Sequence, residues 1–168
     1  MNAGRSRAPL ALIMGFGIFA VSSTAGAADT SCDALTKSMT AVRSTPHHSA
    51  TRMSTASGRT TDIEAIVLPA TAYLKLGDEW TQMDVGAASR QHTAGGFKDF
   101  TNCTVAGNET VNGTPTQIIH FTGRVGEKSA EGRAWIGERD NRPYKLEGHV
   151  GAGALMTVFE YDNVKPPI

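Results

Sequence analysis

Residues 129–167 read SAEGRAWIGERDNRPYKLEGHVGAGALMTVFEYDNVKPP, and this stretch decides the fold. It holds three strand-like runs, Arg133–Glu138, Tyr144–Val150 and Leu155–Tyr161. Turn-forming residues separate the runs, DNRP at 140–143 and GAG at 151–153. Neighbouring strands joined by short turns run antiparallel, so the stretch predicts a three-stranded meander. It contains no catalytic signature.

The chain before this meander predicts six more strands of the same sheet. Apolar and polar residues alternate in several of them, so that Leu74 and Leu76 face away from Tyr73 and Lys75. The dipeptide at 112–113, Asn-Gly, is a strong signal for a two-residue hairpin turn. The expected strands are His47–Thr55, Thr60–Leu68, Ala72–Leu76, Glu79–Met83, one that begins at Cys103, and Gln117–Thr122.

One helix is expected over residues 31–44, where Pro46 ends the segment. Its narrow apolar stripe at helical spacing consists of Cys32, Leu35, Met39 and Val42. A narrow stripe indicates a helix that lies on a surface rather than one that is enclosed on all sides. The sequence thus predicts a mainly β domain with one or two helices.

The segment Asp84–Asn102 is the least regular part of the chain. A weak helix is expected over Val85–His92, before the Gly-Gly pair at 95–96. Within a compact β domain, such a segment is either a functional loop or a surface excursion that Phe97 and Phe100 hold in place.

The first 28 residues have the layout of a secretory signal peptide. Arg5 and Arg7 make the start positive, Leu10–Val21 is apolar, and Ser22–Ala28 is small and neutral. We therefore expect residues 1–28 to be a signal peptide, and residues 29–168 to form a single β domain that is soluble in the periplasm. An uncleaved membrane anchor is the alternative interpretation, although the apolar run is short for a membrane span.

The charge of the chain argues against several classes of partner. The full chain carries 16 basic and 16 acidic side chains, so the loss of Arg5 and Arg7 leaves a net charge of −2. No basic run or patch is present in the sequence. Binding to nucleic acid, or to a membrane through a polybasic segment, is therefore not expected.

Two cysteines are present, Cys32 and Cys103, and in an exported chain an even pair predicts a disulfide. Two free thiols or a metal site are the alternatives. The residues before Cys32 do not form a lipid-attachment motif, so a lipid anchor at this cysteine is not expected. Two cysteines without a nearby group of histidines also make a poor zinc site. We therefore expect no metal.

Motifs of catalysis and cofactor binding are not found. The sequence has no G-x-S-x-G nucleophile elbow and no phosphate-binding glycine loop. Its carboxylates are scattered among polar neighbours, as on a solvated surface rather than in an acid–base pair. We expect neither an enzyme nor a cofactor.

A single sheet of about nine strands must bury one apolar face, and one short helix does not cover a flat sheet of that size. The sheet is therefore expected to curve around the helix and the 84–102 segment. A curved sheet with a loosely fitted helix makes a pocket for an apolar ligand. A filled core without a usable cavity is the alternative.

Four stretches, taken in order, resemble the LolA-like superfamily of periplasmic lipoprotein carriers and their relatives of the LolB, LppX and RseB types. The resemblance implies an incurved antiparallel sheet, or half-open barrel, with a helical lid. The four stretches are YLKLGDEW at 73–80, VAGNETVNGTPTQIIHF at 105–121, AWIGERDNRPYKL at 134–146 and YDNVKPP at 161–167.

By this resemblance the chain is expected to be a non-enzymatic periplasmic binding or carrier protein, with a role in outer membrane biogenesis. Its ligand would be a lipid, an acylated protein or lipoprotein, or another hydrophobic molecule. The alternative is an envelope sensor or regulatory module that binds a protein partner through the same sheet, as RseB-type relatives do. The residues expected to line the site are Leu35, Met39 and Val42 on the lid, and Trp80, Phe121 and Phe159 on the sheet.

Overall fold

The computed structural model describes residues 25–84, 86 and 96–167 of the chain. Its elements are one helix, one short 3-10 turn and nine strands; the sequence predicts the nine strands and a helix, but not the 3-10 turn over the last residues of the expected helix. The elements are α1 (Ala25–Ala41), η1 (Val42–Ser44), β1 (His47–Ser54), β2 (Thr60–Val67), β3 (Thr71–Leu76), β4 (Glu79–Asp84), β5 (Phe97–Val111), β6 (Thr114–Val125), β7 (Lys128–Gly137), β8 (Pro143–Val150) and β9 (Gly153–Glu160).

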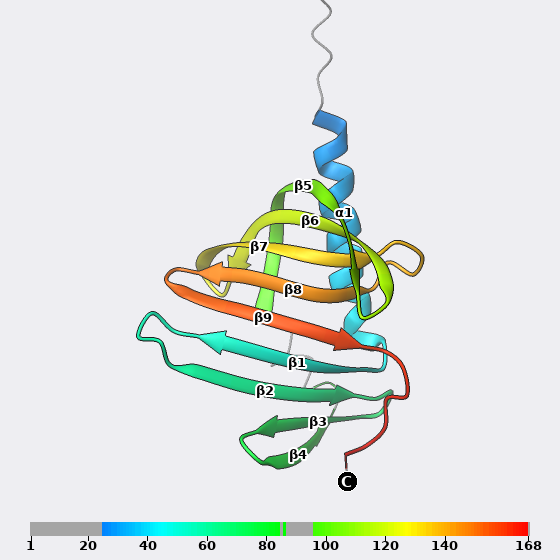
Figure 1. Ribbon diagram of the computed structural model, residues 1–168, viewed down its shortest axis with the longest axis vertical. Coiled ribbons are helices and arrows are strands. Elements are labelled where there is room, and N and C mark those ends of the chain that lie inside the picture. Colours follow the sequence, from blue (N-terminus) through cyan, green and yellow to red (C-terminus); the bar gives the residue numbers. More distant parts are fainter. Residues whose placement is uncertain (1–24, 85, 87–95, 168) are drawn as a thin grey trace, which may run out of the picture.

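All nine strands form one antiparallel sheet with the order β4-β3-β2-β1-β9-β8-β7-β6-β5 (Figure 1). The sheet consists of two meanders, β1–β4 and β5–β9, each made of strands that follow one another in the sequence. The pairing of β1 with β9 joins them, with His48 opposite Glu160. Among the described strands, β4 and β5 each have a neighbour on one side only, so the sheet is open, as expected.

The hairpin between β5 and β6 confirms the turn that the sequence predicts at residues 112 and 113. Asn112 has a φ of 48° and Gly113 a φ of 81°. Positive φ at both central residues is the geometry that matches the twist of a two-residue hairpin. Asn tolerates this conformation better than most residues, and Gly adopts it without strain.

Strand β5 begins at Phe97, so the expectation that the irregular segment extends to Asn102 is wrong. The pairing of β5 with β6 shifts register between Lys98 and Gly107, and Asp99 and Asn102 have φ values of 54° and 52°. Such bulges bend a strand and disturb the alternation of side chains. The disturbed alternation hides the first part of β5 from the sequence pattern. The weak helix expected over Val85–His92 lies outside the described residues, apart from Gly86.

The predicted disulfide between Cys32 and Cys103 is present, with the two Cα atoms 5.1 Å apart. It joins α1 to β5 across 71 residues of sequence. The helix begins at Ala25, six residues before the expected start. The small residues at positions 25–28, which suggest a signal-peptide cleavage site, therefore form the first turn of the helix.

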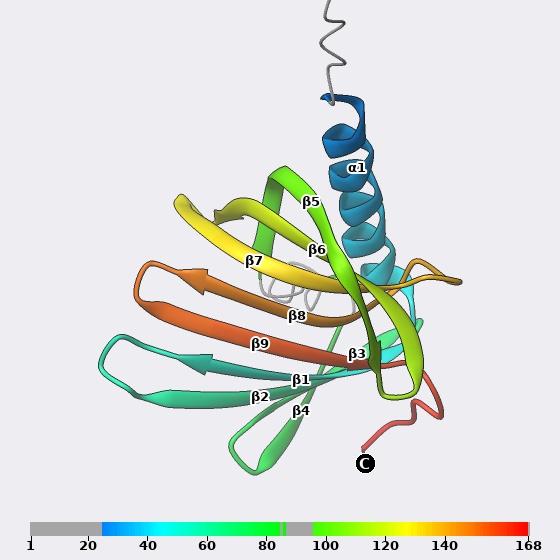
Figure 2. The same ribbon diagram turned by 45° about the horizontal axis from the view of Figure 1, so that its top comes forward.

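Helix α1 lies across the β5 end of the sheet, while β3 and β4 form the far end (Figure 2). The stripe Leu35, Met39 and Val42 is buried against one face of the sheet, which we call the concave face. Their partners there are apolar side chains of five strands, namely Phe97, Cys103, Ile119, Phe121, Ala134, Ile136, Leu146 and Phe159. The core therefore occupies one half of the concave face.

Two glycines let aromatic rings lie directly on the sheet inside this core. Gly132 and Gly148 are cross-strand partners, and a Cβ atom at either position would collide with the ring of Phe121 or Phe97. Those two rings meet edge to face, with centroids 5.3 Å apart. The absence of two Cβ atoms thus brings Phe97 to the middle of the sheet.

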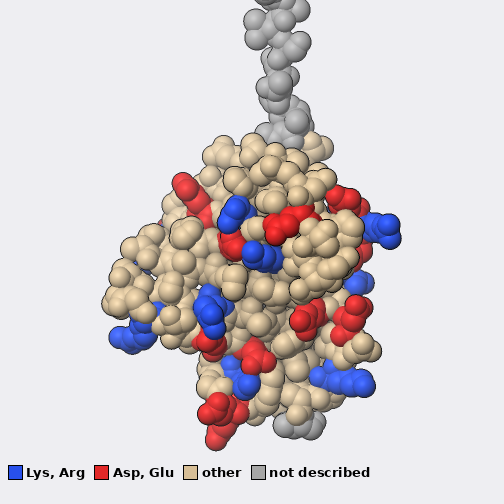
Figure 3. Space-filling view, viewed as in Figure 1, with Lys and Arg blue, Asp and Glu red and all other residues tan. Residues whose placement is uncertain are grey.

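The opposite face, which we call the convex face, is mainly polar. Charged side chains of both signs are interspersed over the face seen in Figure 3. By strand register, the ion pairs Arg52–Asp62 and Arg133–Glu147 belong to the convex face. The apolar exceptions buried there include Ile66 and Tyr73, each 8% exposed, and Trp135, which is 2% exposed. Its indole N–H donates to Glu109 of the β5–β6 hairpin at 2.6 Å.

Within the described part of the chain, α1 is too short or too polar to cross a bilayer, and no other helix there qualifies.

Candidate functional site

The concave face changes from covered to open along one row of cross-strand partners. The exposed fractions are 2% for Ile119, 0% for Leu146 and 2% for Thr157, all near the helix end. Further along the same row, Ile63 is half-buried and Leu76 is 58% exposed. The full row, from β6 to β3, is Ile119, Ala134, Leu146, Thr157, Thr51, Ile63 and Leu76.

The open part of this face is apolar in the middle of the strands. Leu74 and Met53 are half-buried and point to the same side as Ile63 and Leu76, by strand alternation. Val67 and Ala72 form a smaller buried cluster, against which Met83 packs. This cluster lies at the end of these strands where β2 turns into β3. An apolar surface therefore continues from the core under α1 onto strands that α1 does not cover.

Five of the six predicted ligand-binding residues are brought together by the fold. Leu35, Met39, Val42, Phe121 and Phe159 belong to one cluster, and each is at most 6% exposed. They pack against one another in this structure. Access of a ligand to the whole of this cluster therefore requires a shift of α1 relative to the sheet.

Trp80 is not brought to this cluster. In the strand register Trp80 pairs with Lys75, which pairs with Glu64, and this places Trp80 on the convex face. Phe159 lies on the concave face, so the expectation that the two share one surface is wrong. The Lys75 ammonium lies 5.7 Å from the Trp80 ring centroid. A two-residue turn at 77–78 pairs Lys75 with Trp80, so the sequence does contain the signal for this arrangement.

A cavity of about 370 Å³ lies between α1 and the first part of β5. Its walls combine three apolar side chains with two threonines of the helix and three charged residues. Among the described residues, neither Arg43 nor Lys98 has an ion-pair partner. The lining residues are Thr36, Met39, Thr40, Arg43, Phe97, Lys98, Asp99 and Phe100.

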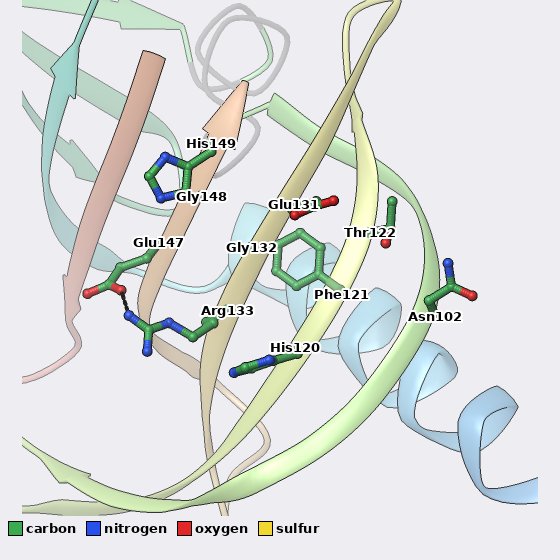
Figure 4. A pocket seen from close by; sticks show the side chains of 10 residues that line it. All are labelled: Asn102, His120, Phe121, Thr122, Glu131, Gly132, Arg133, Glu147, Gly148 and His149. Carbon is green, nitrogen blue, oxygen red and sulfur yellow. Dashed lines mark hydrogen bonds and ion pairs between the residues drawn. The ribbon is translucent and has the colours of Figure 1, made fainter. Parts of the chain in front are cut away.

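A second cavity, of about 320 Å³, lies on the polar side of the sheet (Figure 4). Arg133 donates to Glu147 at 2.5 Å, and Lys145 lies 2.6 Å from the other carboxylate oxygen. Burial raises the pKa of Glu147, but the hydrogen bonds from Lys145 and Arg133 outweigh burial and leave that pKa below its usual value. Glu147 is therefore a paired carboxylate and a poor proton acceptor. The remaining polar side chains of this cavity are Asn102, His120, Thr122, Glu131 and His149.

No metal centre is found in the part of the chain that the structure describes. There, no three His, Cys, Asp or Glu side chains converge as metal ligands would. Both cysteines are in the disulfide. The arrangement that the fold offers is a surface for binding, with apolar contacts on one face and charges of both signs on the other.

Several residues of this surface are absent from the sequence-based prediction. Leu76 lies on the face that alternation predicts, but its exposure depends on where α1 lies. Arg43 and Lys98 belong to elements that meet only in the folded chain. Sequence spacing alone does not place them at one cavity.

The sequence matches no protein-family model and no curated protein. Solved structures do match. The lipoprotein LppX of Mycobacterium tuberculosis has 17% sequence identity and a TM-score of 0.52, over 82% of this chain and 99% of LppX. MucB has 12% identity and a TM-score of 0.55, over 83% of this chain but 61% of MucB.

The complex of MucA and MucB from Pseudomonas aeruginosa also matches, with 12% identity and a TM-score of 0.52. That match covers 82% of this chain and 59% of the chain compared. At these identities the likeness shows the fold alone. It confirms the LolA-like fold that the four sequence stretches resemble.

Proposed function

We propose that this protein is a non-enzymatic binding protein that holds a hydrophobic ligand, such as a lipid acyl chain or an acylated protein, against the concave face of its sheet. The observation that carries the proposal is the gradient of exposure along the concave row, from 0% at Leu146 to 58% at Leu76. An apolar surface that runs from a closed core to solvent provides a place for an apolar molecule.

A second candidate function is the binding of a protein partner through the same sheet. The solved complex of MucB with MucA supports it, because MucB shares this fold and binds another protein. A partner's apolar side chains would cover Ile63 and Leu76 in place of a lipid chain. The two candidates use the same surface and differ in the occupant.

We further propose that the protein acts in the bacterial periplasm, after removal of residues 1–28. The charged start, apolar run and small-residue end of this segment support export. The disulfide between Cys32 and Cys103 supports an oxidising compartment.

Binding of a fluorescent long-chain fatty acid to delipidated protein tests the first function. We expect a Kd in the micromolar range, which corresponds to about −8 kcal/mol. Leu76→Asp is expected to weaken binding at least about tenfold, because a carboxylate at an apolar contact loses hydration without a partner. The variant should still fold, since Leu76 is 58% exposed.

Met156→Asp is the matched control. Met156 is also apolar and exposed, at 38%, but it lies on the convex face opposite Arg52. We expect it to leave the Kd unchanged. Absence of binding by the wild-type protein, or equal loss in both variants, would contradict a ligand site on the concave face. Binding of a protein partner that Leu76→Asp abolishes, without any fatty-acid binding, would favour the second function.

A further inference from the structure

The cavity between α1 and β5 has an apolar interior and a charged rim. Met39 and Phe97 belong to the buried core, with exposed fractions of 6% and 3%, and Phe100 packs against that core. The Phe100 ring meets Phe121 edge to face, with centroids 5.0 Å apart. The apolar wall is therefore held firmly in place by the core.

The rim of this cavity carries more positive than negative charge. Arg43 comes from the 3-10 turn after α1, and Lys98 and Asp99 come from the bulged start of β5. Neither cation is in an ion pair with any residue that the structure describes. Two unpaired cations and one carboxylate favour an anion over a cation or a neutral group at this rim.

An apolar path leads from the cavity to the open half of the concave face. Phe97 lies over Gly148 on β8, and the cross-strand partner of Gly148 on β9 is Leu155. Leu155 in turn pairs with Met53 on β1. Four strand spacings of about 4.8 Å separate β8 from β3, so the path to Leu76 spans roughly 19 Å. This length suits an extended acyl chain.

We propose that the cavity between α1 and β5 binds the anionic headgroup of a single-chain amphiphile, with Arg43 and Lys98 as its ligands and the chain directed past Phe97 along the concave face. The proposal rests on the proposed binding function and names the class of ligand. A carboxylate or a phosphate headgroup satisfies the same two cations.

Paired probes test this assignment on the full-length mature protein. One probe is a fluorescent long-chain fatty acid, and the other is the primary alcohol with the same chain and fluorophore. Wild-type protein should bind the acid about tenfold more tightly than the alcohol, as two partly exposed ion pairs would provide. The preference should decrease as salt is added.

The double variant Arg43→Gln/Lys98→Gln should bind the acid about tenfold more weakly and the alcohol as before. Arg43→Lys/Lys98→Arg should keep the preference, because the charges remain. Lys37→Gln is the matched control, since Lys37 is an exposed cation of α1 that does not line the cavity. All three positions are exposed, so these variants should fold.

The outcomes separate this proposal from the function on which it rests. Equal binding of acid and alcohol by wild-type protein overturns the headgroup site and leaves the hydrophobic ligand in place. Failure of both probes to bind overturns both. If inorganic phosphate alone displaces the acid at low millimolar concentration, the cavity is a simple anion site, and the assignment to an amphiphile is wrong.

Discussion

His47 is the titratable residue that lies deepest in the structure as described. It is 6% exposed, and its Nδ1–H donates to the carbonyl oxygen of Thr45 at 2.7 Å. Its ring centroid lies 5.8 Å from that of Phe159 and 6.2 Å from that of Tyr161. Burial is the largest influence and lowers the pKa of His47, against the raising effect of the Thr45 hydrogen bond.

A lowered pKa in the folded state makes stability depend on pH. In the unfolded chain His47 takes up a proton near pH 6.5, whereas in the folded state it does so only at a lower pH. His47 therefore stabilises the fold fully above about pH 6.5, and this contribution is lost as the pH falls below that value. We expect the urea midpoint to fall between about pH 7.5 and pH 5.5. In His47→Gln this fall should be smaller.

Ile119→Val is the comparison for this experiment, because it weakens the core without changing a titratable group. It should lower the urea midpoint by a similar amount at each pH, at a cost of about 1 kcal/mol. A pH slope in His47→Gln as steep as in the wild-type protein would show that other groups are responsible.

At the scale of elements, the alternation of side chains along most strands predicts the face of the sheet on which each side chain lies. Leu74 and Leu76 lie on the face opposite Lys75, because the pairing of β3 with β2 and β4 has no shift of register. β5 departs from the pattern because its bulges insert residues between the paired ones. The expected start of α1 is too late for another reason. Ala is the best helix former and is also typical of a signal-peptide cleavage site, so the same residues fit both interpretations.

The disulfide is the element-scale feature with the clearest energetic consequence. It closes a loop over 71 residues of sequence, which the chain-entropy model equates with about 4 kcal/mol of stability. Cys32→Ser/Cys103→Ser should therefore lower Tm by roughly 10 °C for a domain of this size. Calorimetry of the variant and of the reduced wild-type protein measures the effect. An unchanged Tm in both would show that α1 stays on β5 without the crosslink.

At the scale of the whole molecule, the sequence predicts the open curved sheet, and five of the six residues that it proposes for the site lie in one cluster. It does not predict how far α1 extends over the sheet. That extent depends on the order of strands, and the order depends on the pairing of β1 with β9 across more than a hundred residues. The exposure of Leu76 follows from this long-range pairing and from no local pattern.

Export and processing are also properties of the whole chain. We expect the intact mass of protein from the periplasm to correspond to a chain that starts at Ala28 or Asp29, because the preceding small residues fit the cleavage rule. Such a chain loses the first residues of α1 and keeps Cys32. A full-length mass in the envelope fraction, or a diacylglycerol group on Cys32 in place of the disulfide, would contradict this.

The central pairing of β1 with β9 also determines when folding is completed. β1 is among the first strands to be synthesised and β9 is the last, so the two meanders do not join until residue 160 is available. Contacts of such long sequence separation form slowly, since a large loop must close first. Until then each meander exposes an unpaired edge and an apolar face. Until β9 has emerged, the two separate meanders therefore depend on protection from aggregation.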